Sequence, residues 1–166
     1  IKYTREMAMV EDYDTYKVFK EPIGVVAALT PWNFPFGQIA KKVIPALLMG
    51  NAVVLKPSQS APLTAYYFAE AALEAGLPAG VLQLVTGRGA EVGDVLASHP
   101  DVHMVSFTGS TKAGVEVSKL ALENIKRLSL ELGGKSPAVI LEGADLDLAI
   151  KETLYGVFPN TGQACS

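Results

Sequence analysis

Short apolar runs alternate with longer segments of helical character from Ile23 onward. The runs predicted as strands are Ile23–Thr30, Asn51–Lys56, Val81–Thr86, His103–Thr108, Arg127–Leu132 and Ala138–Glu142. Their apolar residues are consecutive, which is typical of strands covered on both faces of a parallel sheet. The segments predicted as helices are Phe36–Met49, Ala61–Ala75, Glu91–Ser98, Thr111–Asn124 and Asp145–Val157. This alternation predicts an α/β protein with a doubly wound sheet and right-handed crossovers.

Glycine and proline mark the ends of several predicted helices. Gly50 follows the first helix, Gly76 with Pro78 the second, and Pro100 the third. The first twenty or so residues carry several acids and lack such a pattern, and we expect an irregular or hairpin lead-in there.

Composition excludes several classes of protein. The chain has 166 residues, of which 49% are hydrophobic and 19% charged, and its net charge is −3. That length suits one domain, and so high an apolar content indicates a piece that further chain would cover. Lys and Arg are scattered, so we expect no nucleic-acid partner. The most apolar long stretch, residues 22–40, contains prolines and polar residues, so we expect no membrane span. With one unpaired cysteine and no targeting segment, a cytoplasmic location is the default expectation.

Polar and glycine-rich motifs follow the first four predicted strands. They read PWNFP, KPSQ, TGRG and FTGST in chain order. Sheets of this class bind ligands beyond the carboxyl ends of their strands, so these motifs should gather at one rim.

Two features of this rim suit a phosphate-bearing ligand. Gly109 permits a turn, and Ser110 and Thr111 can cap the next helix, whose free amides would bind an anion. The spacing is neither GxGxxG nor a Walker loop, so an ordinary capped helix is an equal alternative. Lys56 ends a strand and could donate to ribose hydroxyls or phosphate, although a solvated lysine is the plainer reading of that position alone.

Three side chains suggest covalent chemistry. Cys165 can be a nucleophile, and its small, polar neighbours argue against an inert core cysteine. Asn33 can donate an amide hydrogen to an oxyanion, or it can simply form a turn. Glu131 leaves an apolar strand into a glycine turn, where desolvation would suit a general base. The alternative for Glu131 is an ion pair with a lysine such as Lys135.

Taken together, the motifs resemble those of the aldehyde dehydrogenase superfamily. PWNFP, KPS, LPAGVLQLVTG, FTGST, LELGGKSP and NTGQAC occur in that family's order and at closely similar spacing, from about Tyr16 onward. The resemblance implies a Rossmann-like NAD(P) domain over residues 23–132 and the start of a catalytic domain over residues 133–166. Residues 1–22 would then be a lead-in that belongs to an oligomerisation or linker element.

The resemblance also implies a mechanism. Cys165 would attack an aldehyde to form a thiohemiacetal, with the oxyanion held by the Asn33 amide and the Cys165 backbone N–H. Hydride transfer to nicotinamide would leave a thioester, and Glu131 would activate water to release the acid. Lys42 matches a lysine sometimes assigned to proton relay, the alternative being a solvated helix lysine.

The same resemblance implies a set of cofactor contacts and no metal. They are Thr30, Pro31, Trp32, Lys56, Ser58, Gln59, Gly89, Phe107, Gly109, Ser110 and Leu132. Many NAD-preferring members have a glutamate where this chain has Gln59, and its charge repels a 2′-phosphate. We therefore expect either NAD or NADP as the cofactor. Because Gln59 is neutral, NADP should be tolerated, and a preference for NADP over NAD is a hypothesis that follows from the same residue.

Three functions stay open, and the first is the NAD(P)-dependent oxidation of an aldehyde to a free acid that is described above. Because the chain ends one residue past Cys165, we expect a fragment of a longer homodimeric or homotetrameric enzyme, inactive when isolated. A CoA-acylating relative would normally lack the base at the Glu131 position. A non-catalytic nucleotide-binding module is the third reading. The small-molecule aldehyde itself is not predicted.

Overall fold

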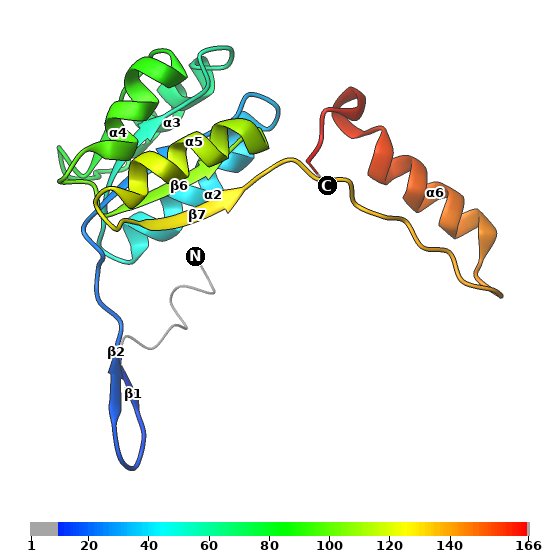
Figure 1. Cartoon of the computed structure of the whole chain (residues 1–166), viewed down its shortest axis with the longest axis horizontal. Helices are drawn as coiled ribbons and strands as arrows, with labels where there is room; N and C mark the ends of the chain where they lie inside the picture. The colour runs from blue at the N-terminus through cyan, green and yellow to red at the C-terminus, as the bar shows by residue number, and fades with distance from the viewer. Residues whose placement is uncertain (1–9, 166) are drawn as a thin grey trace.

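The computed structural model describes residues 10–165. The described chain begins with an antiparallel hairpin of β1 (Val10–Asp12) and β2 (Lys17–Phe19). Tyr13 and Tyr16 stack at its turn, with ring centroids 4.6 Å apart. The hairpin projects from the rest of the molecule (Figure 1).

A five-stranded parallel sheet forms the centre of the fold, in the order β5-β4-β3-β6-β7. Its strands are β3 (Val25–Leu29), β4 (Ala52–Lys56), β5 (Leu82–Leu84), β6 (Met104–Thr108) and β7 (Arg127–Glu131). Chain order reverses direction at β3, between β4 and β6, so this is the switch point where such sheets open a crevice for ligands.

Helices cover both faces of the sheet. Helices α2 (Pro35–Leu48) and α3 (Leu63–Glu74) lie on one face, and α4 (Asp94–Ser98) and α5 (Thr111–Leu122) lie on the other. A π-helical turn, η1 (Gly89–Gly93), leads into α4. The arrangement confirms the predicted doubly wound α/β fold.

Strand β3 shows why the apolar runs are continuous. Val26 and Ala28 pack into the core under α2 and α3, whereas Ala27 and Leu29 pack into the core under α4 and α5. Successive side chains of a strand point to opposite faces, so a strand covered on both sides needs an apolar residue at every position.

The predicted strand at residues 138–142 is wrong, since this segment has no regular structure. Val139 and Leu141 are 76% and 74% exposed. A β-branched run becomes a strand only beside another strand, and no described strand lies beside this one. The segment instead runs outward from β7 to α6 (Leu146–Val157) and the short turn η2 (Pro159–Gly162), which returns the chain toward the sheet (Figure 1).

None of the helices formed by residues 10–165 has both the length and the apolar character needed to cross a lipid bilayer.

Candidate active site

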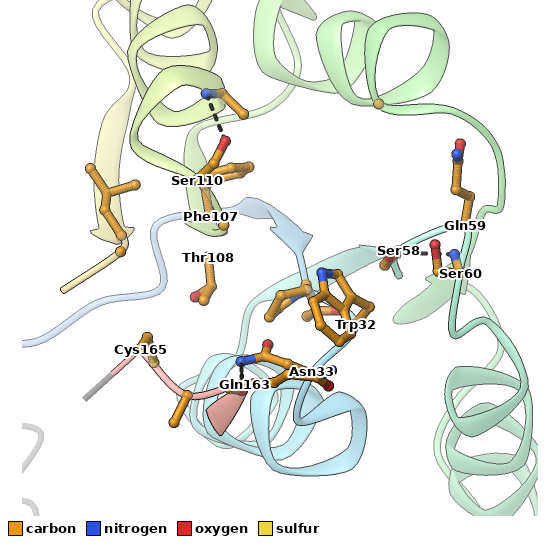
Figure 2. Close-up of a pocket in the computed structure, with 18 of the residues that line it drawn as sticks. Trp32, Asn33, Ser58, Gln59, Ser60, Phe107, Thr108, Ser110, Gln163 and Cys165 are labelled. Atoms are coloured by element: carbon orange, nitrogen blue, oxygen red, sulfur yellow. Dashed lines mark hydrogen bonds between the residues drawn. The ribbon is translucent and has the colours of Figure 1, made fainter. Parts of the chain in front are cut away.

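A cleft of about 660 Å³ opens at the carboxyl ends of the parallel strands. This volume lies within the roughly 300–1,000 Å³ that is usual for small-molecule and cofactor sites. Figure 2 shows Gln59 and Cys165 at opposite ends of the cleft, with Trp32 between them. Its lining combines residues that follow each of the five strands of the sheet with the turn that precedes Cys165.

The cleft brings together most of the residues singled out from the sequence. All eleven predicted cofactor contacts line it, namely Thr30, Pro31, Trp32, Lys56, Ser58, Gln59, Gly89, Phe107, Gly109, Ser110 and Leu132. Asn33 and Cys165 line it too. Glu131 and Lys42 are not among its lining residues.

The N-terminus of α5 opens into the cleft and has free backbone amides. Ser110 has extended backbone angles, and its Oγ accepts a hydrogen bond from the Ala113 amide at 3.2 Å. Gly109 does not adopt a positive φ, so the sharp turn predicted there is not the reason for glycine. A Cβ at Gly109 would lie 2.7 Å from the Phe107 ring, so glycine leaves room for that ring. The capped helix end is therefore available to an anionic group.

Two buried polar groups near β3 and β4 fit a ligand that bears hydroxyl groups. Thr30 Oγ1 is buried and has no hydrogen-bond partner in the described part of the chain. Buried hydroxyls are nearly always paired, so this atom calls for a partner. Lys56 Nζ donates to the Pro57 carbonyl at 3.0 Å, and burial lowers the pKa of the Lys56 ammonium. Hydroxyls and phosphates of a dinucleotide would supply acceptors at this end of the cleft.

At the other end, two loops far apart in sequence meet beside Cys165. Asn33 Nδ2 donates to the Gln163 carbonyl oxygen at 2.8 Å (Figure 2). Asn160 Nδ2 donates to the Asn33 carbonyl oxygen at 2.8 Å. The Cys165 thiol is half-buried and free. The predicted oxyanion donor and the predicted nucleophile are therefore in neighbouring, hydrogen-bonded segments.

Gly134 packs against the backbone of Cys165. A Cβ at position 134 would overlap the Cys165 carbonyl oxygen, and backbone cannot move aside as a flexible side chain can. We expect Gly134→Ala to shift the nucleophile segment and to lower the first-order acylation rate of Cys165 about tenfold or more. The measurement is ester-driven acylation of the thiol, with Gly37→Ala as control, because a Cβ at Gly37 meets nothing within 4 Å. Equal rates for the two variants would contradict the assigned packing.

Glu131, at the end of β7, and Lys42, on α2, do not line the cleft. Lys42 is 9% exposed and its Nζ donates to Ser106 Oγ at 3.0 Å, so the alternative of a solvated helix lysine is wrong. Burial lowers the pKa of Lys42, and the Glu131 charge opposes this. Glu131 is exposed, which corrects the desolvated position expected for it. It lies at the end of β7, an edge strand of the sheet, so no further described strand covers it.

Several lining residues were not singled out from the sequence. They are Ser60, Thr108, Ala113, Gly133, Gly134, Gln163 and Ala164. Five of them, Thr108, Gly133, Gly134, Gln163 and Ala164, belong to the motifs FTGST, LELGGKSP and NTGQAC, so the motif positions carried the signal. Among the described residues no cluster of His, Cys, Asp and Glu is placed to hold a metal ion.

Comparison with known proteins places this geometry in a family. The family model described as "Aldehyde dehydrogenase family" matches residues 2–166. The chain is 50% identical to a 3-succinoylsemialdehyde-pyridine dehydrogenase from Pseudomonas sp., covering 96% of this chain and 35% of the relative. It is 48% identical to an NADP(+) D-glyceraldehyde dehydrogenase from Thermoplasma acidophilum, covering 89% of this chain and 30% of the relative.

A solved structure agrees with the family model and with the two relatives. The crystal structure of a mutant of aldehyde dehydrogenase C from Pseudomonas syringae, in complex with NAD+ and octanal, superposes with a TM-score of 0.93. That protein is 45% identical and the match covers 98% of this chain and 33% of the other. The chain thus spans about a third of the length of the relatives it matches. From the family model, the sequence identity and the shared fold together, the chain belongs to the aldehyde dehydrogenase family.

Proposed function

We propose that this chain supplies the cofactor cleft and the nucleophile for the NAD(P)-dependent oxidation of an aldehyde to a carboxylic acid. The observation that carries the proposal is one continuous cleft, lined by the α5 N-terminus and Lys56 toward one end and by Asn33 and Cys165 at the other. Relatives named as semialdehyde and glyceraldehyde dehydrogenases support an aldehyde as the substrate.

The residues of the chain divide into a binding set and a reacting set. The Ser110 cap and the amides behind it would hold the pyrophosphate, and Lys56 and Thr30 would meet hydroxyl groups. Bound nicotinamide supplies the acceptor for the hydride that leaves the substrate carbon. Trp32 and Leu132 line the cleft and would contact the nicotinamide.

Cys165 would carry the covalent step. Its thiolate adds to the aldehyde carbon, and the carbonyl electron pair moves onto oxygen to give a thiohemiacetal oxyanion. The Asn33 amide and the Cys165 backbone N–H would stabilise that charge. After oxidation of the carbon, Glu131 would take a proton from water, the resulting hydroxide adds to the thioester, and the Cys165 thiolate leaves as the acid forms.

The experiment that tests this function uses the whole protein that contains the chain, NAD+ or NADP+ and a panel of aldehydes. We expect one equivalent of free acid for each reduced cofactor, with no requirement for CoA. Acyl-CoA formed only when CoA is added would favour the CoA-acylating alternative. Reduced cofactor absent with every aldehyde would favour the non-catalytic module.

Gln59 supports a finer proposal on cofactor choice. It lines the cleft and is exposed, and as a neutral side chain it would not repel a 2′-phosphate. We expect Gln59→Glu to lower kcat/KM with NADP+ about tenfold or more while changing the NAD+ value less, because only NADP+ carries the extra charge. Gln83→Glu introduces the same charge at an exposed position of β5 that does not line the cleft, and is the matched control.

The cofactor proposal has a clear negative outcome. If the wild-type kcat/KM favours NAD+ over NADP+ by more than a hundredfold, the lack of a negative charge at Gln59 does not determine the cofactor preference, and the proposal is wrong. The cytoplasmic location and the homodimeric or homotetrameric assembly stay predictions.

A further inference from the structure

Two asparagine side chains join the loop before α2 to the turn that carries the nucleophile. Asn33 Nδ2 donates to the Gln163 carbonyl, and Asn160 Nδ2 donates to the Asn33 carbonyl, both at 2.8 Å. Asn160 Nδ2 also lies 3.4 Å from the Gln163 carbonyl. The partners are about 130 residues apart in sequence, so these bonds connect two distant segments of the chain.

The turn that Asn160 begins is held in an unfavourable conformation. Asn160 (φ 51°, ψ 40°) and Thr161 (φ 57°, ψ 33°) are both left-handed, and Gly162 follows with φ 77°. A β-branched residue such as Thr161 rarely adopts these angles. Such conformations persist only where surrounding contacts enforce them, and they concentrate at functional sites. The asparagine hydrogen bonds are contacts of this kind, and they involve Asn160 and Gln163, five and two residues before the free thiol of Cys165.

We infer that Asn160 is a positioning residue, which sets the place of the Asn33 amide relative to Cys165. The inference rests on the proposed function to the extent that Asn33 is taken as the oxyanion donor. An asparagine amide has two hydrogens. The Gln163 carbonyl occupies one of those on Asn33, which leaves the other in a fixed direction for a substrate oxygen.

The hydrogen bond from Asn160 to Asn33 should affect the reaction rate, because an oxyanion donor has to be placed precisely. An oxyanion donor acts when it lies about 2.7–3.1 Å from the charged oxygen. A misplacement of about 1 Å can cost on the order of a hundredfold in rate. Without the Asn160 amide, the Asn33 carbonyl loses its partner and the strained turn can relax, so the donor and the thiol would move apart.

Two substitutions separate the hydrogen bonds from the backbone conformation. Asn160→Gly keeps the left-handed backbone accessible but removes the amide. Asn160→Asp keeps the shape of the side chain but places an acceptor against two carbonyl oxygens. If Asn160 served only to tolerate a left-handed φ, the glycine variant would behave as wild type.

The test compares two reactions of Cys165 in the whole protein. Acylation by p-nitrophenyl acetate proceeds by thiolate addition to the ester carbonyl and loss of p-nitrophenolate, so it needs an oxyanion donor. Alkylation by iodoacetamide displaces iodide directly and forms no oxyanion. We expect both Asn160 variants to slow acylation about tenfold to hundredfold while alkylation changes less than about threefold. In a double-mutant cycle, adding Asn33→Ala should cost little further, because residues that act through one another are not additive.

Three results would overturn the inference. One is acylation at the wild-type rate in Asn160→Gly, another is an equal loss in both reactions, and the third is full additivity with Asn33→Ala. Neither reaction uses NAD(P) or an aldehyde. A protein that passes this test but oxidises no aldehyde would refute the proposed function and leave the role of Asn160 intact.

Discussion

Replacement of Cys165 by alanine is expected to abolish aldehyde oxidation, with kcat lowered by at least about 10⁴-fold, because the covalent route loses its nucleophile. Cys165 is the one cysteine in the sequence, so no neighbouring thiol of this chain can replace it. The half-buried thiol lies at the end of the cleft that Asn33 also lines. The measurement is the steady-state formation of reduced cofactor with a saturating aldehyde.

Cofactor binding is the control for this variant. Alanine fills less space than cysteine and touches no group of the proposed pyrophosphate site, so the Kd for NAD+ or NADP+ from titration calorimetry should change less than about twofold. Cys165→Ser should be nearly as inactive, because an unactivated hydroxyl is a far weaker nucleophile than a thiolate. Retention of more than a few per cent of activity in Cys165→Ala would refute the assignment of the nucleophile.

The sheet could be predicted because burial on both faces leaves a local signature. Each of the five strands of the parallel sheet lies within a predicted apolar run, and the Ser110 cap could be predicted from its position before a helical segment. The run at residues 138–142 has the same composition but forms no strand. Composition reports what a segment can do, whereas strand formation depends on an available edge.

The sequence predicted which residues line the cleft, but it did not predict the long-range contacts between them. Motif positions located the cleft lining, because loops that follow parallel strands must meet at one rim. The burial of Lys42 against Ser106 depends on packing between α2 and β6, 64 residues apart. The bond from Asn160 to Asn33 spans 127 residues. No local pattern encodes contacts of that kind, so only the folded chain reveals them.

Glu131 is the residue for which sequence and structure give the most different pictures. The sequence indicates a desolvated base, and the structure shows an exposed carboxylate next to the cleft. Glu131 pairs with Thr108, a lining residue, in the β6–β7 register, and its carbonyl accepts from the Gly109 amide at 3.1 Å. Its charge also reaches Lys42, whose pKa it raises against the effect of burial. An exposed carboxylate at this place has ready access to water, which suits the hydrolytic half of the proposed reaction.

Glu131→Gln is therefore expected to slow hydrolysis of the thioester selectively, lowering kcat about 10²–10⁴-fold, as loss of a general base does. Stopped-flow measurement should show a fast burst of one equivalent of reduced cofactor per site, followed by a slow steady state. Hydroxylamine, which attacks thioesters without a base, should trap the acyl group as a hydroxamate and restore part of the turnover. The control is Glu123→Gln, the same change at the exposed C-terminal end of α5.

The shape of the transient distinguishes the possible roles of this carboxylate. If the burst itself slows as much as the steady state, Glu131 acts earlier, on the Cys165 thiol, and the assignment to water is wrong. If neither phase changes relative to Glu123→Gln, Glu131 has no part in the chemistry, and the free acid must then form through another base. A burst followed by a stall is the one result that ties the exposed carboxylate beside Thr108 to water attack, and it would also separate this chain from relatives that finish with a thiol.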